Sequence, residues 1–289
     1  MIYKLQPILK HRLWGGNKLP QIYHQSTNDK IGEAWILSCI DNDNSPIDEE
    51  ATLLDLFKKD PSIVGKNYQG NFPLLIKLID AQDDLSIQVH PSIKTEFWHI
   101  LNTTPSKLYM GFNADTNKQE IQTLLQQGKI TSVLNHIDVK QNDSYLINPG
   151  TIHAIGKGTF LIEIQQSADV TYRLYDYNRV DQDNKHRPLH IDQALNCIDY
   201  KKLEISQTNN DTHLINCPFF NVYKHHITDK LSLNANEQSF HAIVILEGSG
   251  KIKTNDQAIA FEPYDTFFIP ARTNTYEIDG NATIIQVTL

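Results

Sequence analysis

Hydrophobic and polar residues alternate in short runs along most of the chain. In LSIQVHP (residues 85–91), Leu85, Ile87 and Val89 alternate with polar side chains, which is the two-residue period of a β-strand. Similar runs, rich in β-branched and aromatic residues, lie at residues 32–40, 72–80, 144–150, 160–166 and 170–176. This part of the chain is therefore predicted to be mainly β.

Three segments instead have the spacing of short amphipathic helices. The first covers residues 52–59. The second lies within about residues 115–136 and is interrupted near Gly128. The third, at about residues 188–200, opens with a proline, which is favoured in the first turn of a helix. We expect the last two to be helical insertions between strands.

The polar, turn-rich tract SQTNNDT (residues 206–212) is a candidate linker. Every run after it is strand-like, at residues 219–227, 230–235, 241–250, 251–254, 257–264, 265–270, 275–278 and 283–289. Many short strands joined by turns are typical of a sandwich or barrel. We predict a domain at residues 1–206 that carries the helices, and a smaller β domain at residues 207–289.

A weak internal repeat relates the two parts. DSYLINPGTIHAI (residues 143–155) resembles DTFFIPARTNTYEI (residues 265–278), since both run from an acid through an aromatic strand to a proline turn. Only the first copy has a histidine, His153, after the turn. A repeated strand-turn-strand unit predicts two similar β domains, of which only the first keeps a site; the alternative is a chance match over a short stretch.

The polar face of LSIQVHP is a candidate metal site. Gln88 and His90 are two residues apart, so on a strand they point the same way. Glu96 follows in the next loop, and His153 can come from another strand of the same barrel. Mixed nitrogen and oxygen ligands suit zinc, iron or manganese more than copper. On spacing alone, a half-exposed polar strand face stays the alternative.

Two cations could accompany such a site. Lys94 lies two residues before Glu96. Arg173 shares one face of its predicted strand with Tyr175, and arginine binds phosphate or carboxylate through two parallel hydrogen bonds. The alternative is a solvent-facing Arg173 paired with Asp176 or Asp169.

Composition and charge exclude several other classes. The formal net charge of -8 argues against a nucleic-acid surface, so an anion would need a few cations placed in a pocket. A run of about 18 apolar residues, as a membrane-spanning helix needs, does not occur in the sequence. The three cysteines lie far apart and are read as reduced, and the N-terminus lacks the features of a secretory signal. We therefore expect a cytoplasmic protein.

Several motifs together resemble a known family. LLIKLIDAQDDLSIQVHP, KTEFW, NPGTIHAIGKGTFLIEIQQSADVTYRLYDYNR and RPLHIDQAL are similar to type I mannose-6-phosphate isomerases of the short bacterial form. The resemblance implies a mainly β fold of two cupin-type (jelly-roll) barrels with a few inserted helices. It also implies interconversion of mannose 6-phosphate and fructose 6-phosphate, with one Zn2+ per chain bound by Gln88, His90, Glu96 and His153.

The same resemblance implies the roles of further residues. Arg173, Lys94 and Glu163 are expected to be catalytic, and Ser86 and Lys77 to line the substrate pocket together with Lys94 and Arg173. Glu163 is the candidate base, with His99 and Lys94 as the alternatives, and a hydride shift without a base stays open. Only five residues separate His90 from Glu96, where many relatives carry a longer loop, which predicts a more open pocket rim.

Two other functions fit a cupin barrel. One is a non-catalytic sensor that binds a sugar phosphate. The other is an iron oxygenase, although such sites usually present His-x-His where this chain has Gln-x-His. The expected partner is a small sugar phosphate, with neither nucleic acid nor membrane. The oligomeric state stays open because the chain has no coiled-coil heptad pattern.

Overall fold

The computed structural model describes residues 1–181, 183–206 and 211–289, which form two compact units. The first unit contains Met1–Ile8, Trp35–Ile76 and the C-terminal strands. The second contains Leu9–Ala34 and the described residues from 77 to 206. Strands dominate both, so the predicted mainly β fold is confirmed. Residues 207–210 of the predicted linker lie outside the described residues, and the predicted domain limits at 206 and 207 stay a prediction.

The first unit is built on one sheet, with the strand order β1-β20-β18-β21-β16-β15, β17 beside β21 and β19 beside β18. The strands are β1 (Tyr3–Leu5), β15 (His213–Asn216), β16 (Asn221–Ile227), β17 (Lys230–Ala235), β18 (His241–Lys253), β19 (Ala258–Phe261), β20 (Thr266–Ile269) and β21 (Asn274–Thr288). The same unit contains β4 (Cys39–Ile40), β5 (Asp43–Asn44), α2 (Leu53–Lys59) and the 3-10 turn η1 (Pro61–Ile63).

Two long strands replace four shorter ones predicted from the sequence. β18 joins the predicted runs 241–250 and 251–254, and β21 joins 275–278 and 283–289. Gly248 (φ +89°) and Gly280 (φ +145°) have backbone angles that L side chains rarely adopt, and a Cβ on Gly248 would overlap the backbone oxygen of Asn281. The two strands stay paired across these glycines, with a register shift between Ile245 and Glu247 of β18.

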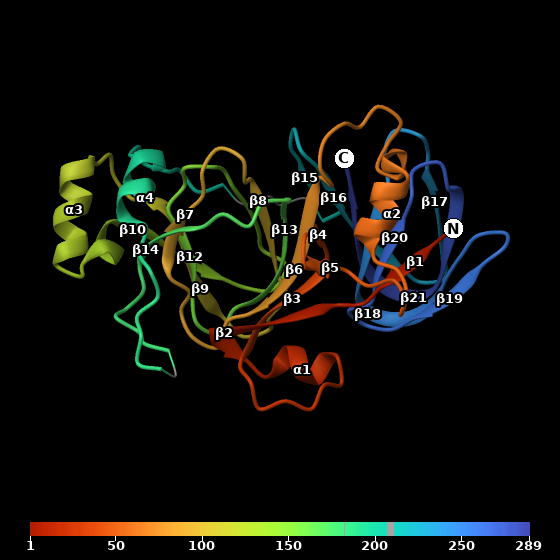
Figure 1. The fold of residues 1–289 in the computed structure, drawn as a ribbon, viewed down its shortest axis with the longest axis horizontal. Coiled ribbons are helices and arrows are strands. Elements are labelled where there is room, and N and C mark those ends of the chain that lie inside the picture. The colour runs from red at the N-terminus through yellow and green to blue at the C-terminus, as the bar shows by residue number, and fades with distance from the viewer. Residues whose placement is uncertain (182, 207–210) are drawn as a thin grey trace. The chain divides into compact units, whose positions relative to one another are not determined.

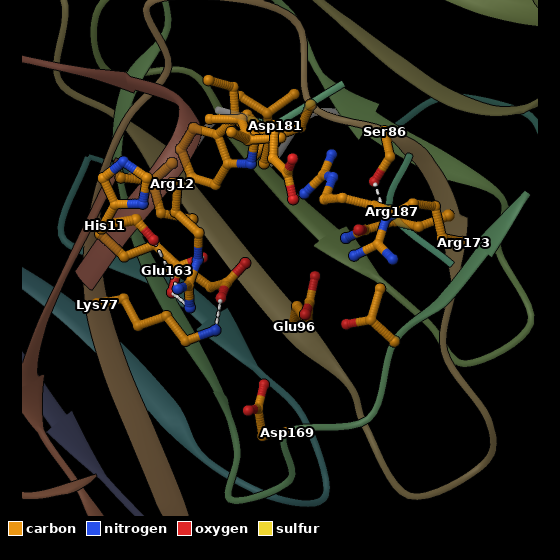
Figure 2. A pocket seen from close by; sticks show the side chains of 18 of the residues that line it. His11, Arg12, Lys77, Ser86, Glu96, Glu163, Asp169, Arg173, Asp181 and Arg187 are labelled. Carbon is orange, nitrogen blue, oxygen red and sulfur yellow. Dashed lines mark hydrogen bonds and ion pairs between the residues drawn. The ribbon is translucent and has the colours of Figure 1, made fainter. Parts of the chain in front are cut away.

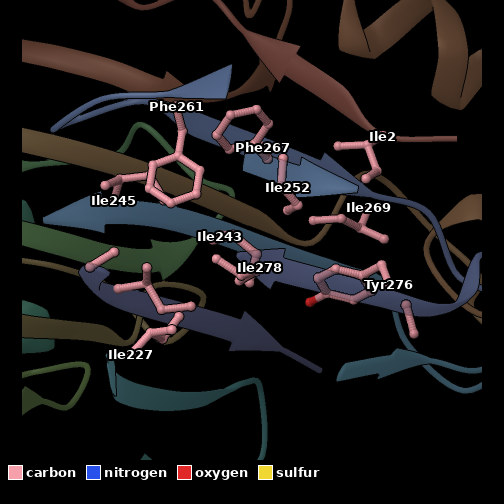
Figure 3. Packing of buried hydrophobic residues seen from close by; sticks show 13 residues of the cluster. Ile2, Ile227, Ile243, Ile245, Ile252, Phe261, Phe267, Ile269, Tyr276 and Ile278 are labelled. Carbon is pink, nitrogen blue, oxygen red and sulfur yellow. The ribbon is translucent and has the colours of Figure 1, made fainter. Parts of the chain in front are cut away.

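The core of the first unit consists mainly of isoleucine and phenylalanine side chains from β16, β18, β20 and β21 (Figure 3). Helix α2 confirms the prediction for residues 52–59. Thr52 caps it: its Oγ1 accepts from Asp55 N (3.2 Å), and Asp55 Oδ2 accepts from Thr52 N (3.0 Å).

The strands of the second unit form two sheets that pack face to face, and two of these strands continue into Trp35–Ile76, which is assigned to the first unit. The strand orders are β10-β9-β12-β7-β14 and β11-β8-β13-β6-β3-β2. The elements are β2 (Ile8–Gly16), α1 (Lys18–Ile22), β3 (Ile31–Leu37), β6 (Leu74–Asp80), β7 (Ile87–Val89), β8 (Glu96–Ile100), β9 (Ser106–Phe112), α3 (Lys118–Gln126), η2 (Ile130–Val133), β10 (Leu134–Val139), β11 (Ser144–Ile147), β12 (His153–Ile155), β13 (Phe160–Gln166), β14 (Tyr172–Tyr175) and α4 (Ile191–Cys197). Trp98 and Ile100 of one sheet pack with Leu108 and Met110 of the other, which closes the interior.

A second core covers the outer face of the sheet that contains β7. Ile87 and Val89 pack there with residues of α3, η2 and α4, and Figure 1 shows both helices on that side of the strands. The two predicted helical insertions are thus confirmed. Since the apolar face of β7 points outward, its polar face points into the barrel. Leu85 precedes β7 and packs in the inner core instead, so the alternation begins only at the strand.

Candidate metal centre and substrate pocket

The four predicted metal ligands lie together where the two sheets face each other. In the sheet register, Gln88 of β7 pairs with His153 of β12 on one side and with Arg173 of β14 on the other. His90 directly follows β7, and Glu96 is the first residue of β8 in the opposite sheet. The ligand atoms of His90, Glu96 and His153 all lie within 4.8 Å of one another, and all three residues are buried.

The individual distances are those of a tight polar cluster. His90 Nε2 lies 3.1 Å from Glu96 Oε1, and His153 Nε2 lies 3.7 Å from Glu96 Oε2. Gln88 Nε2 lies 3.3 Å from His153 Nε2. The two imidazole rings are tilted against each other with centroids 4.8 Å apart. Turning the Gln88 amide by 180° would put its oxygen where the nitrogen now lies, because the two arms of an amide have nearly the same shape.

Backbone carbonyls orient both imidazoles. His90 Nδ1 donates to Val170 O (2.7 Å), and His153 Nδ1 donates to Thr151 O (2.8 Å). A proton on Nδ1 leaves a lone pair on Nε2, which is how a metal-bound histidine is commonly held. Burial lowers the pKa of His90 to about 4, against the opposing attraction of Glu96. Burial also lowers the pKa of His153. Both rings are therefore neutral at pH 7, as metal ligands must be.

Glu96 supplies the negative charge of the cluster. Burial raises the pKa of Glu96, but the charge of Lys94 and the interaction with His90 lower it by more. The pKa of Glu96 therefore lies well below its usual range. Its Oε2 is buried and accepts no hydrogen bond from the described residues. A buried carboxylate oxygen without a donor, facing two imidazole lone pairs, fits a bound cation. The donor set therefore fits a divalent metal ion.

Lys94 lies beside the predicted ligands, as the sequence indicated. Its ammonium group is 2.8 Å from Glu96 Oε1 and 3.3 Å from His90 Nε2, and the side chain is buried. A cation this close both holds Glu96 ionised and can reach a molecule bound at the cluster.

Glu163 and Lys77 form a second buried group in the sheet that contains β8. Glu163 Oε1 accepts from Lys77 Nζ (2.9 Å), and its Oε2 accepts from the indole of Trp98 (2.9 Å). Lys77 also donates to Gln165 Oε1 (2.7 Å). Burial lowers the pKa of Lys77, but the attraction of Glu163 and more distant glutamates outweighs it and raises the pKa. Lys77 and Glu163 are therefore a charged pair.

His99, an alternative base in the sequence analysis, lies elsewhere. It is on β8 at an odd spacing from Glu96 and Trp98, so its side chain occupies the other face of the strand. Its Nδ1 hydrogen-bonds to Ser144 Oγ (2.7 Å). This position removes His99 from the candidate bases.

A pocket of about 820 Å3 opens onto these groups, a size suited to a small ligand. Gln88, Lys94, Glu96, Lys77, Glu163, Ser86 and Arg173 all line it. Figure 2 shows Arg173 and Ser86 on one side of the pocket, Lys77 and Glu163 on the other, and Glu96 between them. Arg173 Nε donates to Ser86 Oγ (3.2 Å) and its Nη1 to Pro188 O (2.9 Å).

Arg173 is therefore held at the pocket and not in solvent. Asp176, one of its two suggested partners, instead accepts hydrogen bonds from Arg179 and Arg187. The expectation that Tyr175 shares a face with Arg173 is wrong: the register shifts between these residues, and Tyr175 packs on the outer core.

Several pocket residues were missed by sequence reasoning. They are Arg12, Glu33, Asp169 and Arg187, all of which line the pocket. Asp169 was considered only as a partner for Arg173, and Arg187 was part of a recognised motif, RPLH, without being given a role. The strand alternation of β2 and β3 could have placed Arg12 and Glu33 on inward faces, but not beside each other.

Comparisons with known proteins agree on one family. The family model described as phosphomannose isomerase type I, catalytic domain, matches residues 2–129, and the model described as mannose-6-phosphate isomerase, cupin domain, matches residues 209–289. Mannose-6-phosphate isomerase ManA of Bacillus subtilis is 31% identical, covering 97% of this chain and 96% of its own. Mannose-6-phosphate isomerase of Streptococcus mutans is 29% identical over the same shares.

Solved structures give the same result. The mannose 6-phosphate isomerase from Bacillus subtilis matches with a TM-score of 0.90 and 30% identity, covering 100% of this chain and 99% of that one. A putative mannosephosphate isomerase from Archaeoglobus fulgidus matches with a TM-score of 0.85 at 19% identity, covering 99% and 96%, which shows the fold alone. The predicted cupin-type fold is thus confirmed. Among the described residues, helices are too short or too polar to cross a membrane; a cytoplasmic location stays a prediction.

Proposed function

The chain belongs to the type I mannose-6-phosphate isomerase family and interconverts mannose 6-phosphate and fructose 6-phosphate, and we propose that Gln88, His90, Glu96 and His153 hold one Zn2+ per chain for this reaction. The observation that supports the proposal is the convergence of two neutral imidazoles on a buried, ionised Glu96. Zinc is favoured over iron because an oxygenase site usually offers His-x-His where this chain has Gln88 and His90.

Isomerisation moves a proton between C1 and C2 and passes through a negatively charged enediolate. When bound, the ion supplies a fixed positive charge that stabilises negative charge on the sugar oxygens. Lys94, whose ammonium group lies 2.8 Å from Glu96, adds a hydrogen-bond donor at the same place. We assign it to the stabilisation of the sugar oxygens at C1 and C2.

We assign the role of the base to Glu163. It lines the pocket, and each of its carboxylate oxygens accepts one hydrogen bond, Oε1 from Lys77 and Oε2 from Trp98. A carboxylate has about four lone-pair positions, so two remain for the substrate while the donors fix its orientation. With His99 on the other face of β8, Lys94 is the remaining alternative.

Removal of the metal tests the proposed site. The purified protein is expected to contain about one zinc per chain and to lose its isomerase activity in a chelator. Added Zn2+ is expected to restore that activity, because the folded protein holds the ligands in place but needs the ion to be active. Elemental analysis and a coupled assay on the same sample measure both. Full activity in metal-free protein would contradict the proposed site.

Replacing Glu163 with Gln tests the base. The substitution keeps the size of the side chain, and its single amide oxygen can accept from only one of the two donors, Lys77 or Trp98. It removes the basic carboxylate, and a lost base typically costs about 100- to 10,000-fold in rate. We expect kcat to fall within that range while the zinc content stays at one per chain. In 2H2O, the wild type is expected to incorporate deuterium at C1 or C2, which a base that exchanges its proton with solvent allows and a hydride shift does not.

Glu33→Gln is the matched control for this substitution. Glu33 also lines the pocket and also pairs with a cation, Arg12, at 2.9 Å, but it has no proposed role, so its replacement is expected to change kcat less than about threefold. A Glu163→Gln variant that keeps most of its activity, beside a Lys94→Met variant that loses it, would transfer the base to Lys94.

A further inference from the structure

Trp98 is buried beside the proposed base and is not among the described residues that line the pocket. It lies on β8 between Glu96 and Ile100, and the three side chains point to the same face because they are two residues apart on one strand. Glu96 belongs to the proposed metal cluster, whereas Ile100 belongs to the inner core. Trp98 therefore lies where the polar site ends and the apolar core begins.

The indole N–H of Trp98 is bonded to Glu163. The two residues are directly opposite each other in the pairing of β8 with β13. Nε1 donates to Glu163 Oε2 over 2.9 Å, while Glu163 Oε1 accepts from Lys77 on its other side (Figure 2). A buried tryptophan usually finds a partner for its N–H. Here that partner is the carboxylate to which we assign the proton transfer.

The two donors differ in rigidity. Lys77 reaches Glu163 at the end of a flexible four-carbon chain, and its ammonium group also donates to Gln165 Oε1 (2.7 Å). Trp98 carries its single N–H on a planar ring. That ring is fully buried in the inner core, and protein interiors are close-packed. The indole is therefore the more rigid of the two donors, and it can fix the plane of the Glu163 carboxylate.

The same ring also contacts the metal cluster. Its centroid lies 5.4 Å from that of His153, and the two ring planes meet at 78°, which is an edge-to-face contact. One buried side chain thus contacts both a proposed metal ligand and the proposed base. These two parts of the site must act on the same sugar, so their relative placement matters for the rate.

We propose that Trp98 is a positioning residue for the isomerisation, whose indole N–H keeps the Glu163 carboxylate turned so that a free lone pair faces the sugar carbons. The proposal rests on the proposed function, since it takes Glu163 as the base. Lys77 and Trp98 occupy two of about four lone-pair positions of the carboxylate, one on each oxygen. Without the indole donor the carboxylate can turn, and a displacement of about 1 Å can cost about 100-fold in rate.

Trp98→Phe is the first test. It removes the N–H but keeps an aromatic ring beside His153. We expect kcat to fall about 10- to 100-fold, the range for a lost charge-assisted hydrogen bond and a displaced reacting group. The KM for mannose 6-phosphate is expected to change less than about threefold, because the substrate does not contact the indole. The zinc content is expected to stay at one per chain.

Trp98→His separates the hydrogen bond from the packing. Imidazole is smaller than phenyl, but its Nε2 is as many bonds from Cβ as the indole Nε1, so it can return a donor to Glu163. At about pH 8, where an ordinary imidazole is neutral, we expect kcat to decrease in the order wild type, Trp98→His, Trp98→Phe. If Trp98 only fills space, the larger phenyl ring gives the faster enzyme. That reverse order would overturn the proposal.

Ile100→Val is the matched control. It removes one methylene group from the same inward row of β8 and from the same core, and no polar contact is lost with it. Its kcat is expected to change less than about threefold. A loss in Ile100→Val as large as that in Trp98→Phe would show that the packing of this core, and not the indole N–H, sets the rate.

Combining Trp98→Phe with Glu163→Gln tests whether the indole acts through the carboxylate. In the Glu163→Gln background no base is left to position, so Trp98→Phe is expected to change kcat less than about threefold there. Equal losses in both backgrounds would overturn the role of Trp98 alone. A Glu163→Gln single variant that keeps most of its activity would overturn the base and, with it, the role of Trp98, so the two failures are distinguishable.

Discussion

Replacing His90 with Ala is expected to abolish metal binding and isomerase activity together. The imidazole is buried, neutral, and oriented by the carbonyl of Val170 so that Nε2 faces Glu96 at 3.1 Å. Without it, the proposed set of four ligands loses one of its two imidazole nitrogens. We expect the zinc content to fall below about 0.1 per chain and kcat/KM to fall at least 1,000-fold, roughly the effect of losing several kcal/mol of metal-derived stabilisation. Elemental analysis and the coupled assay measure the two quantities.

Two further variants make this result specific. His90→Gln keeps a side chain of similar length and so separates loss of the ligand from a general loss of folding. It is expected to bind zinc more weakly than the wild type, and its activity is expected to fall in proportion to its zinc content. His136→Ala removes a histidine whose Nε2 bonds to Thr131 O at the surface, and it is expected to behave as the wild type. A His90→Ala protein with one zinc per chain and normal turnover would show that His90 is not a ligand.

The alternation in LSIQVHP predicted that Gln88 and His90 share a face, because side-chain direction on a strand follows from the backbone alone. It did not predict which face points into the barrel. Ile87 and Val89 are as buried as core residues, yet their core lies outside the sheet, beneath α3 and α4. An alternating sequence indicates that one face of a strand is buried, but not what covers that face. A strand with helices on its apolar face and a polar site on the other therefore has the same pattern as a strand whose polar face is in solvent.

Pairs of charged residues distant in sequence were the hardest to predict. Arg12 and Glu33 come from different strands, and Lys77 and Glu163 are 86 residues apart. The sequence contains many acids and bases, so nothing local indicates which will meet. The grouping of Asp176 with Arg187 and Arg179 likewise depends on how the loop after β14 folds back. Which charged groups of the pocket are paired with each other could be determined only from the structure.

Long strands were predicted in pieces for a related reason. Glycine and polar residues near Gly248 and Gly280 look like turns in the sequence. In the sheet the same glycines adopt positive φ angles while the pairing of β18 with β21 continues past them. Local composition cannot distinguish a glycine inside a long strand from a glycine at the end of a strand, because the difference depends on whether the partner strand continues.

Replacing Arg173 with Ala is expected to leave the metal in place while activity collapses. The residue is adjacent to Gln88 in the sheet register but is not among the proposed metal ligands, so zinc content is expected to stay at one per chain. Its half-buried guanidinium is fixed by Ser86 and Pro188 and faces the pocket, where a charge acts in a medium of lower dielectric constant than water. We expect kcat/KM to fall about 1,000-fold, the size of effect typical of a lost stabilising donor.

The division of this loss between kcat and KM separates two roles for Arg173. If it only binds phosphate, the loss appears in KM. If it also stabilises charge that develops at the reacting oxygens, kcat falls as well, and we expect this second result because Arg173 lies next to Gln88, a proposed metal ligand, in the sheet. Arg12→Ala is the control, since Arg12 lines the same pocket but is neutralised by Glu33; its effect on kcat is expected to stay below about threefold. An Arg173→Ala variant that loses its zinc, or that keeps most of its kcat/KM, would show that Arg173 acts neither on phosphate nor on the developing charge.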